Sequence, residues 1–291
     1  DNGTNLANQV NSQGVEATEC KHLTVRNLVV ANMYVRTRGT EQISYGVGIS
    51  NSDTLGNGVN NYLVTNCIVH DAYIGVRGDF EAGDHTYEFS YITAYNCNWG
   101  GSCSDRRNTS TMDGLLVHHN YFHSWTNWDD PSINSWHHNG FFAYARSGGS
   151  LNNVRFYSNF FGPSYSLSLS DDALKTNHAT AGIYVSGKVD GILVYNNIFI
   201  ATDDSGPSNG FVYFNLSWVF TSAAIYNNTF VGNGGGFGRA VYVGPGTGTF
   251  IVKNNLGVGL GTFIASFYAT DSVLSSDYNF GYGLHAGQEY C

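Results

Sequence analysis

The chain has 291 residues and a formal net charge of −9, and only 12% of its residues are Asp, Glu, Lys or Arg. Its 42% hydrophobic and 15% aromatic fractions exclude a disordered chain. The 13 basic residues form no cluster, so no nucleic-acid partner is expected. No apolar run approaches the roughly 20 residues that cross a bilayer, so no membrane partner is expected either. The 36 Gly, 20 Tyr and 18 Phe residues favour short strands and tight turns over helices.

A short segment recurs along the whole chain, and each copy predicts a strand that bends at its centre. The clearest copies are residues 194–199, 225–230 and 252–257, which carry Asn-Asn at their third and fourth positions. Looser copies extend the series in both directions, at intervals of 22 to 39 residues. The fourth position of the copies reads, in chain order, Leu28, Cys67, Ile92, Asn120, Asn159, Asn197, Asn228, Asn255 and Asp277.

A second apolar segment, entered through a small residue, precedes most copies. It occurs at residues 14–17, 46–49, 140–144, 182–185, 210–214, 240–243 and 262–265. Each unit therefore predicts a strand, a turn, a strand, a bend at Asn and a further strand. One unit alone cannot bury its apolar side, whereas parallel stacking of successive units can, with Asn over Asn in a hydrogen-bonded ladder.

This pattern resembles the right-handed parallel β-helix of the pectate-lyase-like superfamily. The resemblance implies an all-β fold, in which residues 1–291 form one single-stranded solenoid domain of about nine rungs. The alternative is an antiparallel sandwich, which has no reason to repeat the segment in one phase. A cap is expected to be missing at the N-terminal end, because the repeat already starts by Gly14.

Two outward-facing columns are expected, because alternate residues of a strand point to opposite faces. Aligning the first segments puts Phe141, Ile183, Phe211 and Val241 inward, and Phe142, Tyr184, Val212 and Tyr242 outward. Aligning the second segments puts Arg26, Thr65, His118, Tyr157, Tyr195, Tyr226 and Lys253 outward. Exposed aromatic columns suit sugar rings, and they equally suit packing between subunits or under a loop.

The densest polar cluster lies in the insertion at residues 124–140. It contains Trp125, Trp128, Trp136, Asp129, Asp130, His137 and His138. The run His-His-Asn-Gly at its end resembles a His-His-Asp-Gly run of some pectate-lyase-like proteins. Asn139 stands where that run has Asp, which removes a potential metal ligand or base. A second cluster, predicted to meet the first on a neighbouring rung, contains Asp171, Asp172, Lys175 and His178.

Two chemistries fit these clusters. Glycoside hydrolysis needs two carboxylates, which Asp129 or Asp130 and Asp171 or Asp172 would supply from separate rungs. Uronate lyase chemistry needs a base and a cation. For it the candidates are His137, His138, His178 and Lys175, with Asp-bound Ca²⁺ as the possible cofactor. The alternative is that both clusters are ordinary solvated turns.

The five cysteines bear on compartment and assembly. Cys97 and Cys103 flank a short Gly-rich stretch that a disulfide would close, and the low charge with few Lys resembles secreted proteins. Cys291 is left over, so an intermolecular bond through it is an option.

Two functions follow from these observations. The first is a secreted carbohydrate-active or carbohydrate-binding protein, a lyase or hydrolase that acts on an extracellular polysaccharide. The second is a non-catalytic structural or adhesive subunit of an extracellular filament, sheath or tail spike, which associates end to end.

Overall fold

The computed structural model describes residues 12–18, 20–33, 46–52, 61–80, 86–105, 111–125, 138–145, 148–163, 181–201, 210–215, 222–233, 239–243, 248–266 and 273–283. Within these ranges every regular element is a β-strand, as the composition predicts. Accordingly, no helix in the described part of the chain is long and apolar enough to cross a membrane.

The strands are short except for two. In chain order they are β1 (Ser12–Thr18), β2 (Leu23–Arg26), β3 (Val29–Met33), β4 (Gly46–Ser52), β5 (Asn61–Phe80), β6 (Thr86–Asp105), β7 (Thr111–Asp113), β8 (Leu115–His118), β9 (Tyr121–His123), β10 (Asn139–Ala145), β11 (Ser150–Asn152), β12 (Arg155–Tyr157), β13 (Phe160–Phe161), β14 (Ala181–Gly187), β15 (Val189–Asp190), β16 (Ile192–Tyr195), β17 (Ile198–Ile200), β18 (Gly210–Asn215), β19 (Ser222–Tyr226), β20 (Thr229–Val231), β21 (Arg239–Val243), β22 (Thr249–Lys253), β23 (Leu256–Val258), β24 (Thr262–Ser266), β25 (Val273–Asp277) and β26 (Phe280–Tyr282).

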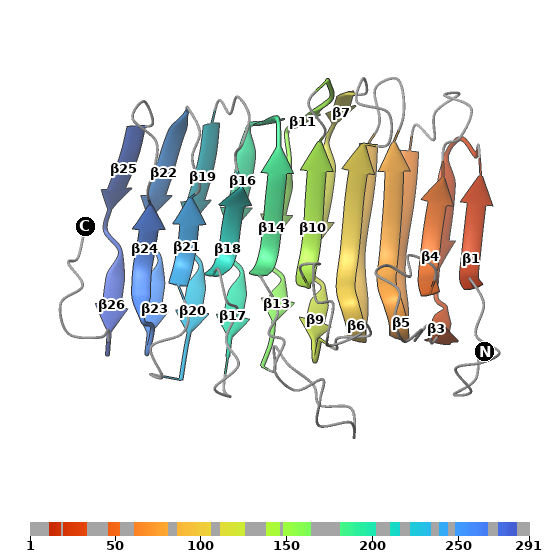
Figure 1. Cartoon of the computed structure of the whole chain (residues 1–291), viewed down its shortest axis with the longest axis horizontal. Helices are drawn as coiled ribbons and strands as arrows, with labels where there is room; N and C mark the ends of the chain where they lie inside the picture. Colours follow the sequence, from red (N-terminus) through yellow and green to blue (C-terminus); the bar gives the residue numbers. More distant parts are fainter. Residues whose placement is uncertain are drawn as a thin grey trace, which may run out of the picture.

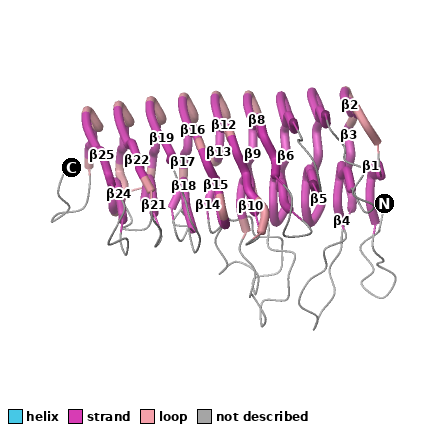
Figure 2. Tube along the Cα trace, turned by 90° about the horizontal axis from the view of Figure 1, so that it is seen from above, coloured by secondary structure: helices cyan, strands magenta, loops and turns pink. Residues whose placement is uncertain are grey.

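All the strand pairs of the described residues are parallel. The chain advances from β1 to β24–β26 along the long axis (Figures 1 and 2). Most strands belong to one large parallel sheet, and β7, β11 and β15 form a small second sheet. This arrangement is compatible with a parallel β-helix.

Three series of neighbouring strands define three faces. Face 1 contains, in pairing order, β2, β5, β6, β8, β12, β16, β19, β22 and β25. Face 2 contains β3, β5, β6, β9, β13, β17, β20, β23 and β26. Face 3 contains β1, β4, β5, β6, β10, β14, β18, β21 and β24. The 20-residue strands β5 and β6 pass through all three faces.

The predicted ladder of Asn side chains is present. Each Asn donates its Nδ2–H to the Oδ1 atom of the next one over 2.9–3.0 Å. The series ends at Asn279, not at Asp277 as predicted. Asp277 lies opposite Lys253, which precedes the ladder residue Asn255 by two residues, and Asn255 bonds to Asn279. The ladder consists of Asn120, Asn159, Asn197, Asn228, Asn255 and Asn279.

The bend beside the ladder has a left-handed backbone. The residue before each of the six ladder positions, and before Leu28, Cys67 and Ile92 at the equivalent positions of the first three copies, has φ between 52° and 60°. This is a region that Asn tolerates better than other non-Gly residues. Many of these residues are therefore Asn, which explains the Asn-Asn pairs in the repeat. The full set is Asn27, Asn66, Tyr91, His119, Ser158, Asn196, Asn227, Asn254 and Tyr278.

The interior is filled by stacked apolar side chains. The predicted inward residues Phe141, Ile183, Phe211 and Val241 are all buried in the main core cluster. The prediction for Val212 is wrong, because Val212 pairs with Ile183 and Val241 and is fully buried. The cause is a register offset of one residue, in which Gly210 lies opposite Ala181 rather than Gly182.

The predicted disulfide is absent. Cys97 and Cys103 are free thiols, both buried within β6. The Sγ atom of Cys97 donates to the Tyr95 carbonyl oxygen at 3.3 Å, and Cys103 Sγ lies 3.7 Å from Met112 Sδ. A single strand runs between the two thiols, because Gly101 pairs with Val76 and Phe141 in the sheet instead of closing a loop.

Candidate functional site

The predicted catalytic residues lie mostly outside the described part of the chain. This applies to Asp129, Asp130, His137, Asp171, Asp172 and His178, and to the predicted substrate-binding residues Trp128, Trp136 and Lys175. The strands that follow the two insertions are described. They are β10 and β14. These two strands pair with each other, and Asn139 lies opposite Ala181. The two insertions therefore lead into adjacent strands of face 3.

Two predicted site residues of the first insertion, His138 and Trp125, are buried. His138 is 3% exposed and Asn139 is fully buried at the start of β10. Trp125 belongs to the main core cluster. Its ring is therefore a packing element and not an open platform for a sugar.

The outward aromatic column of face 3 is the main feature of the candidate site. Phe142, Tyr184, Tyr213 and Tyr242 lie opposite one another on β10, β14, β18 and β21. Ring centroids are 5.1 Å apart for Phe142–Tyr184, 4.8 Å for Tyr184–Tyr213 and 4.9 Å for Tyr213–Tyr242. Tyr213 takes the place that the sequence assigned to Val212.

Burial divides this face-3 aromatic column into anchors and accessible groups. Phe142 and Tyr184 are only 8% and 6% exposed, although their side chains point outward from the sheet. Tyr213 and Tyr242 are partly exposed. Burial raises the pKa of Tyr213 to about 12, so its hydroxyl is a neutral hydrogen-bond donor and acceptor across the physiological range. The accessible part of the column therefore presents ring edges and hydroxyl groups.

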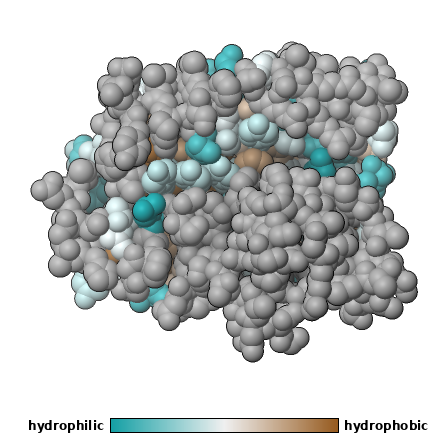
Figure 3. Space-filling view, in the orientation of Figure 1, coloured by the Kyte–Doolittle hydropathy of each residue, from teal (hydrophilic) through white to brown (hydrophobic). Residues whose placement is uncertain are grey.

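Polar groups flank the column at both ends. The Arg77 guanidinium pairs with the buried Asp79 carboxylate at 2.7 Å, and Ser104 Oγ donates to Asp79 Oδ1 at 2.8 Å. At the other end the Arg239 guanidinium carbon lies 5.2 Å from the centroid of the Tyr242 ring. In Figure 3 the described residues of this side form a lengthwise band in which polar and apolar patches alternate. The two cations are thus already partnered, by a carboxylate and by a ring.

The predicted second column lies on face 1 and includes a stack of rings. Registered pairs connect His118, Tyr157, Tyr195 and Tyr226, and the ring centroids are 4.6, 5.1 and 5.2 Å apart. The rings are nearly parallel, so neighbouring rings cover one another's faces. Stacking of a sugar on a ring face is therefore blocked within the series, and edges and hydroxyls are what a ligand would meet.

His118 also contacts a carboxylate. Its Nε2 atom lies 3.1 Å from Glu88 Oε1, and its Nδ1 lies 2.9 Å from His119 Nδ1. Burial lowers the pKa of His118 despite the opposing effect of Glu88. A neutral imidazole is therefore the favoured form at neutral pH.

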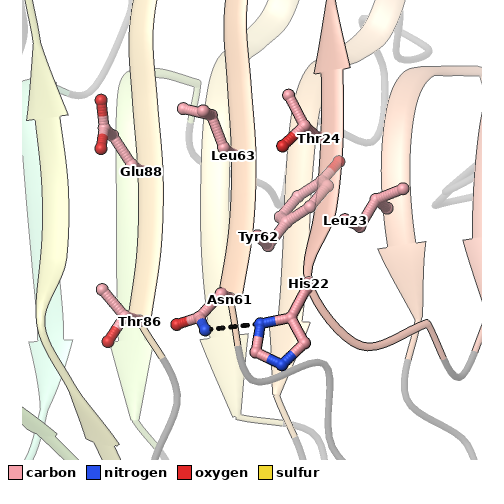
Figure 4. Close-up of a pocket in the computed structure, with 8 residues that line it drawn as sticks. All are labelled: His22, Leu23, Thr24, Asn61, Tyr62, Leu63, Thr86 and Glu88. Atoms are coloured by element: carbon pink, nitrogen blue, oxygen red, sulfur yellow. Dashed lines mark hydrogen bonds between the residues drawn. The ribbon is translucent and has the colours of Figure 1, made fainter.

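A pocket of about 280 Å³ lies beside this cluster, over β2, β5 and β6 (Figure 4). Asn61 Nδ2 donates to His22 Nδ1 at 2.8 Å, which leaves the proton of a neutral His22 ring on Nε2. Glu88 is the single carboxylate of the lining, and it already bonds His118 and Ser90. The pocket therefore lacks the paired carboxylates that glycoside hydrolysis needs.

Metal binding finds no support among the described residues, where no group of three or more His, Cys, Asp or Glu side chains can hold an ion. The Ca²⁺ hypothesis therefore depends on Asp129, Asp130, Asp171 and Asp172 and stays a prediction. The sequence analysis did not single out Tyr213 or the Arg77–Asp79 pair. Arg77 and Asp79 are two residues apart on β5, so alternation along that strand was the available signal for this pair. No local signal gave Tyr213, because its outward position is set by pairing with Tyr184 and Tyr242.

No protein-family model, no curated protein and no solved structure matches this chain.

Proposed function

We propose that this chain is a secreted, right-handed parallel β-helix of about nine rungs, similar to pectate-lyase-like proteins, and that it binds an extracellular polysaccharide along face 3. The parallel pairing of all three faces and the Asn ladder support the helical arrangement. The proposed location rests on the low charge and not on a disulfide, since Cys97 and Cys103 are free.

The single observation that carries this proposal is the face-3 aromatic column with its polar flanks. A column that crosses four neighbouring strands offers the same kind of contact at each strand spacing, about 4.8 Å apart. An extended polymer with repeating hydroxyl groups matches such an array better than a compact ligand does. Tyr213 and Tyr242 supply donors and acceptors for sugar hydroxyls. Asn215, at the end of β18, donates its Nδ2–H to the Tyr184 hydroxyl at 2.9 Å and adds an amide beside the column.

The charges favour a neutral polymer over a strongly anionic one. The net charge of the chain is −9, and Arg77 and Arg239 are already engaged by Asp79 and by the ring of Tyr242. A polyanion that bound Arg77 would compete for its guanidinium with the buried Asp79 carboxylate, which would then lose its partner.

Cleavage of the polymer is the second part of the proposal. The two insertions that carry Asp129, Asp130, Asp171 and Asp172 lead into the paired strands β10 and β14, which also begin the aromatic column. We assign one carboxylate of each insertion to the acid and base roles of a hydrolase. In a lyase, His137, His178 or Lys175 would act as the base.

Affinity electrophoresis in gels that contain neutral or acidic polysaccharides tests the binding. Tyr213→Ala and Tyr242→Ala are expected to weaken binding of the retained polymer about tenfold each, which corresponds to about 1.4 kcal/mol. Tyr226→Ala is the matched control, because Tyr226 is a partly exposed member of the stack on face 1. Equal losses in all three variants would contradict a site on face 3.

Cleavage is tested separately, by reducing ends for a hydrolase and by absorbance at 235 nm for unsaturated products of a lyase. Asp130→Ala is expected to abolish the product while leaving retention in the gel unchanged. Activity that survives in each of Asp129→Ala, Asp130→Ala, Asp171→Ala and Asp172→Ala would overturn the assignment of these carboxylates without touching the binding proposal.

A second candidate is a structural or adhesive subunit. The observation that favours it is the exposure of Tyr278, Phe280 and Tyr282 on β26 and the bend before it. Electron microscopy distinguishes the two, since end-to-end association gives filaments and the polysaccharide-binding protein gives separate particles.

A further inference from the structure

Exposed apolar side chains gather on face 2. Of the eleven exposed large hydrophobic side chains among the described residues, seven point outward from the strands of this face. They are Val29, Ile68, Tyr121, Ile198, Leu256, Phe280 and Tyr282. Scattered exposed apolar residues need no explanation, but a contiguous set marks an interaction surface.

Six of these seven residues, all except Tyr282, belong to one continuous column. Residue by residue, the strand register connects Val29, Ile68, Thr93, Tyr121, Phe160, Ile198, Thr229, Leu256 and Phe280. Nine registered positions span eight strand spacings of about 4.8 Å, or roughly 38 Å. None of the nine is charged, in a chain whose net charge is −9.

A second apolar run lies beside it, two residues further along the strands. Ile200, Val231, Val258 and Tyr282 are paired in register. Towards β5 the same line continues as His123, Tyr95 and His70, whose rings stack with centroids 5.1 and 4.6 Å apart. The described part of face 2 is therefore a strip two side chains wide. It is mostly apolar from β13 to β26, and its β5 end carries His70, which pairs with the Asp71 carboxylate at 2.6 Å.

We propose that face 2 is the interface of a homodimer, in which the strip packs against the strip of a second copy. Two columns with their side-chain margins are roughly 15 Å wide, so each copy would bury roughly 600 Å². The total of roughly 1,200 Å² reaches the lower bound of stable protein interfaces.

A second copy fits this strip for a geometric reason. The apolar side chains repeat at the strand spacing on both copies, so two strips interdigitate along their whole length, which a partner without such a repeat cannot do. The nine positions of the first column carry no charged side chain, which keeps the repulsion between two acidic chains away from this column. A two-fold axis, the commonest symmetry of homodimers, then passes near Phe160, the fifth of the nine positions.

Analytical ultracentrifugation of the full chain from about 1 to 100 µM tests the proposal. The chain is expected to sediment as a dimer, and Ile198→Lys is expected to raise its dissociation constant at least tenfold. Ile251→Lys is the matched control, because Ile251 is an isoleucine of similar exposure, 38% against 41%, that points outward from face 1. Circular dichroism melts verify that both variants fold.

Oxidative cross-linking measures the symmetry. Phe160→Cys is expected to form a disulfide-linked dimer beyond the wild-type background, whereas Phe280→Cys at the far end of the column is not. If the wild-type chain stays monomeric at 100 µM, the proposal is overturned, and face 2 is then a surface for another molecule. Equal weakening by Ile198→Lys and Ile251→Lys, or larger assemblies that Ile198→Lys leaves intact, would also overturn it.

Discussion

The Asn ladder makes a quantitative prediction for the variant Asn197→Ala. The Asn197 side chain is 1% exposed. Its Oδ1 accepts from the backbone N–H of Asn159 at 3.0 Å and from Asn159 Nδ2 at 2.9 Å. Its Nδ2 donates to the Phe156 carbonyl oxygen at 2.9 Å, to Asn228 Oδ1 at 3.0 Å and to the Tyr195 carbonyl oxygen at 3.1 Å. Alanine removes all of these bonds at once.

The magnitude follows from the groups that lose a partner. The backbone N–H of Asn159 and the carbonyl of Phe156 each lose a buried partner, at about 1–3 kcal/mol per group. The free energy of unfolding should therefore fall by about 2–6 kcal/mol. For a chain of 291 residues a loss of 3 kcal/mol corresponds to a decrease in Tm of roughly 5 °C.

Urea denaturation followed by circular dichroism measures this loss. The control is Asn227→Gly, at an exposed neighbouring position whose φ of 57° glycine adopts without strain, so its unfolding free energy should change by less than about 0.5 kcal/mol. Asn197→Asp keeps the acceptor oxygens but removes the donors, so it should destabilise the fold at neutral pH as well. If Asn197→Ala falls within about 0.5 kcal/mol of the control, the ladder does not stabilise the fold and the reasoning is refuted.

Three further predictions concern other parts of the structure. The pKa of His118 is lowered in the folded chain, so the unfolded state binds a proton at His118 more readily. Stability should therefore decrease as the pH falls through about 6.5 towards 5. The urea midpoints of His118→Gln should depend less on pH than those of the wild type, and an equal dependence contradicts this. Burial raises the pKa of Cys97 to about 12 and raises that of Cys103 well above its usual value, so both thiols should resist Ellman's reagent until the chain is unfolded; modification of either thiol in the native chain, located by mass spectrometry, would argue against this packing. A Cβ atom at Gly75 would lie 2.4 Å from the Gly100 carbonyl oxygen, so Gly75→Ala should lower the unfolding free energy by about 1–3 kcal/mol; an unchanged urea midpoint would show that the two strands separate easily.

The sequence by itself determined the strand-rich class, the repeating unit and most of the side-chain directions. The repeat of Asn at one position predicted the ladder because stacked amides can each donate to and accept from the same group on the next strand. Alternation along the second segments placed His118, Tyr157, Tyr195 and Tyr226 in one outward column, which the register confirms.

Only the tertiary structure decided register and burial. A local pattern cannot distinguish Asp277 from Asn279 as the last ladder position, nor Val212 from Tyr213 as the outward residue of β18, because pairing with the neighbouring strand sets the register. The direction of a side chain likewise does not determine its exposure, so Phe142 points outward and is nevertheless buried. Register and burial depend on contacts between residues that are far apart in the chain, and those contacts exist only after the strands have paired.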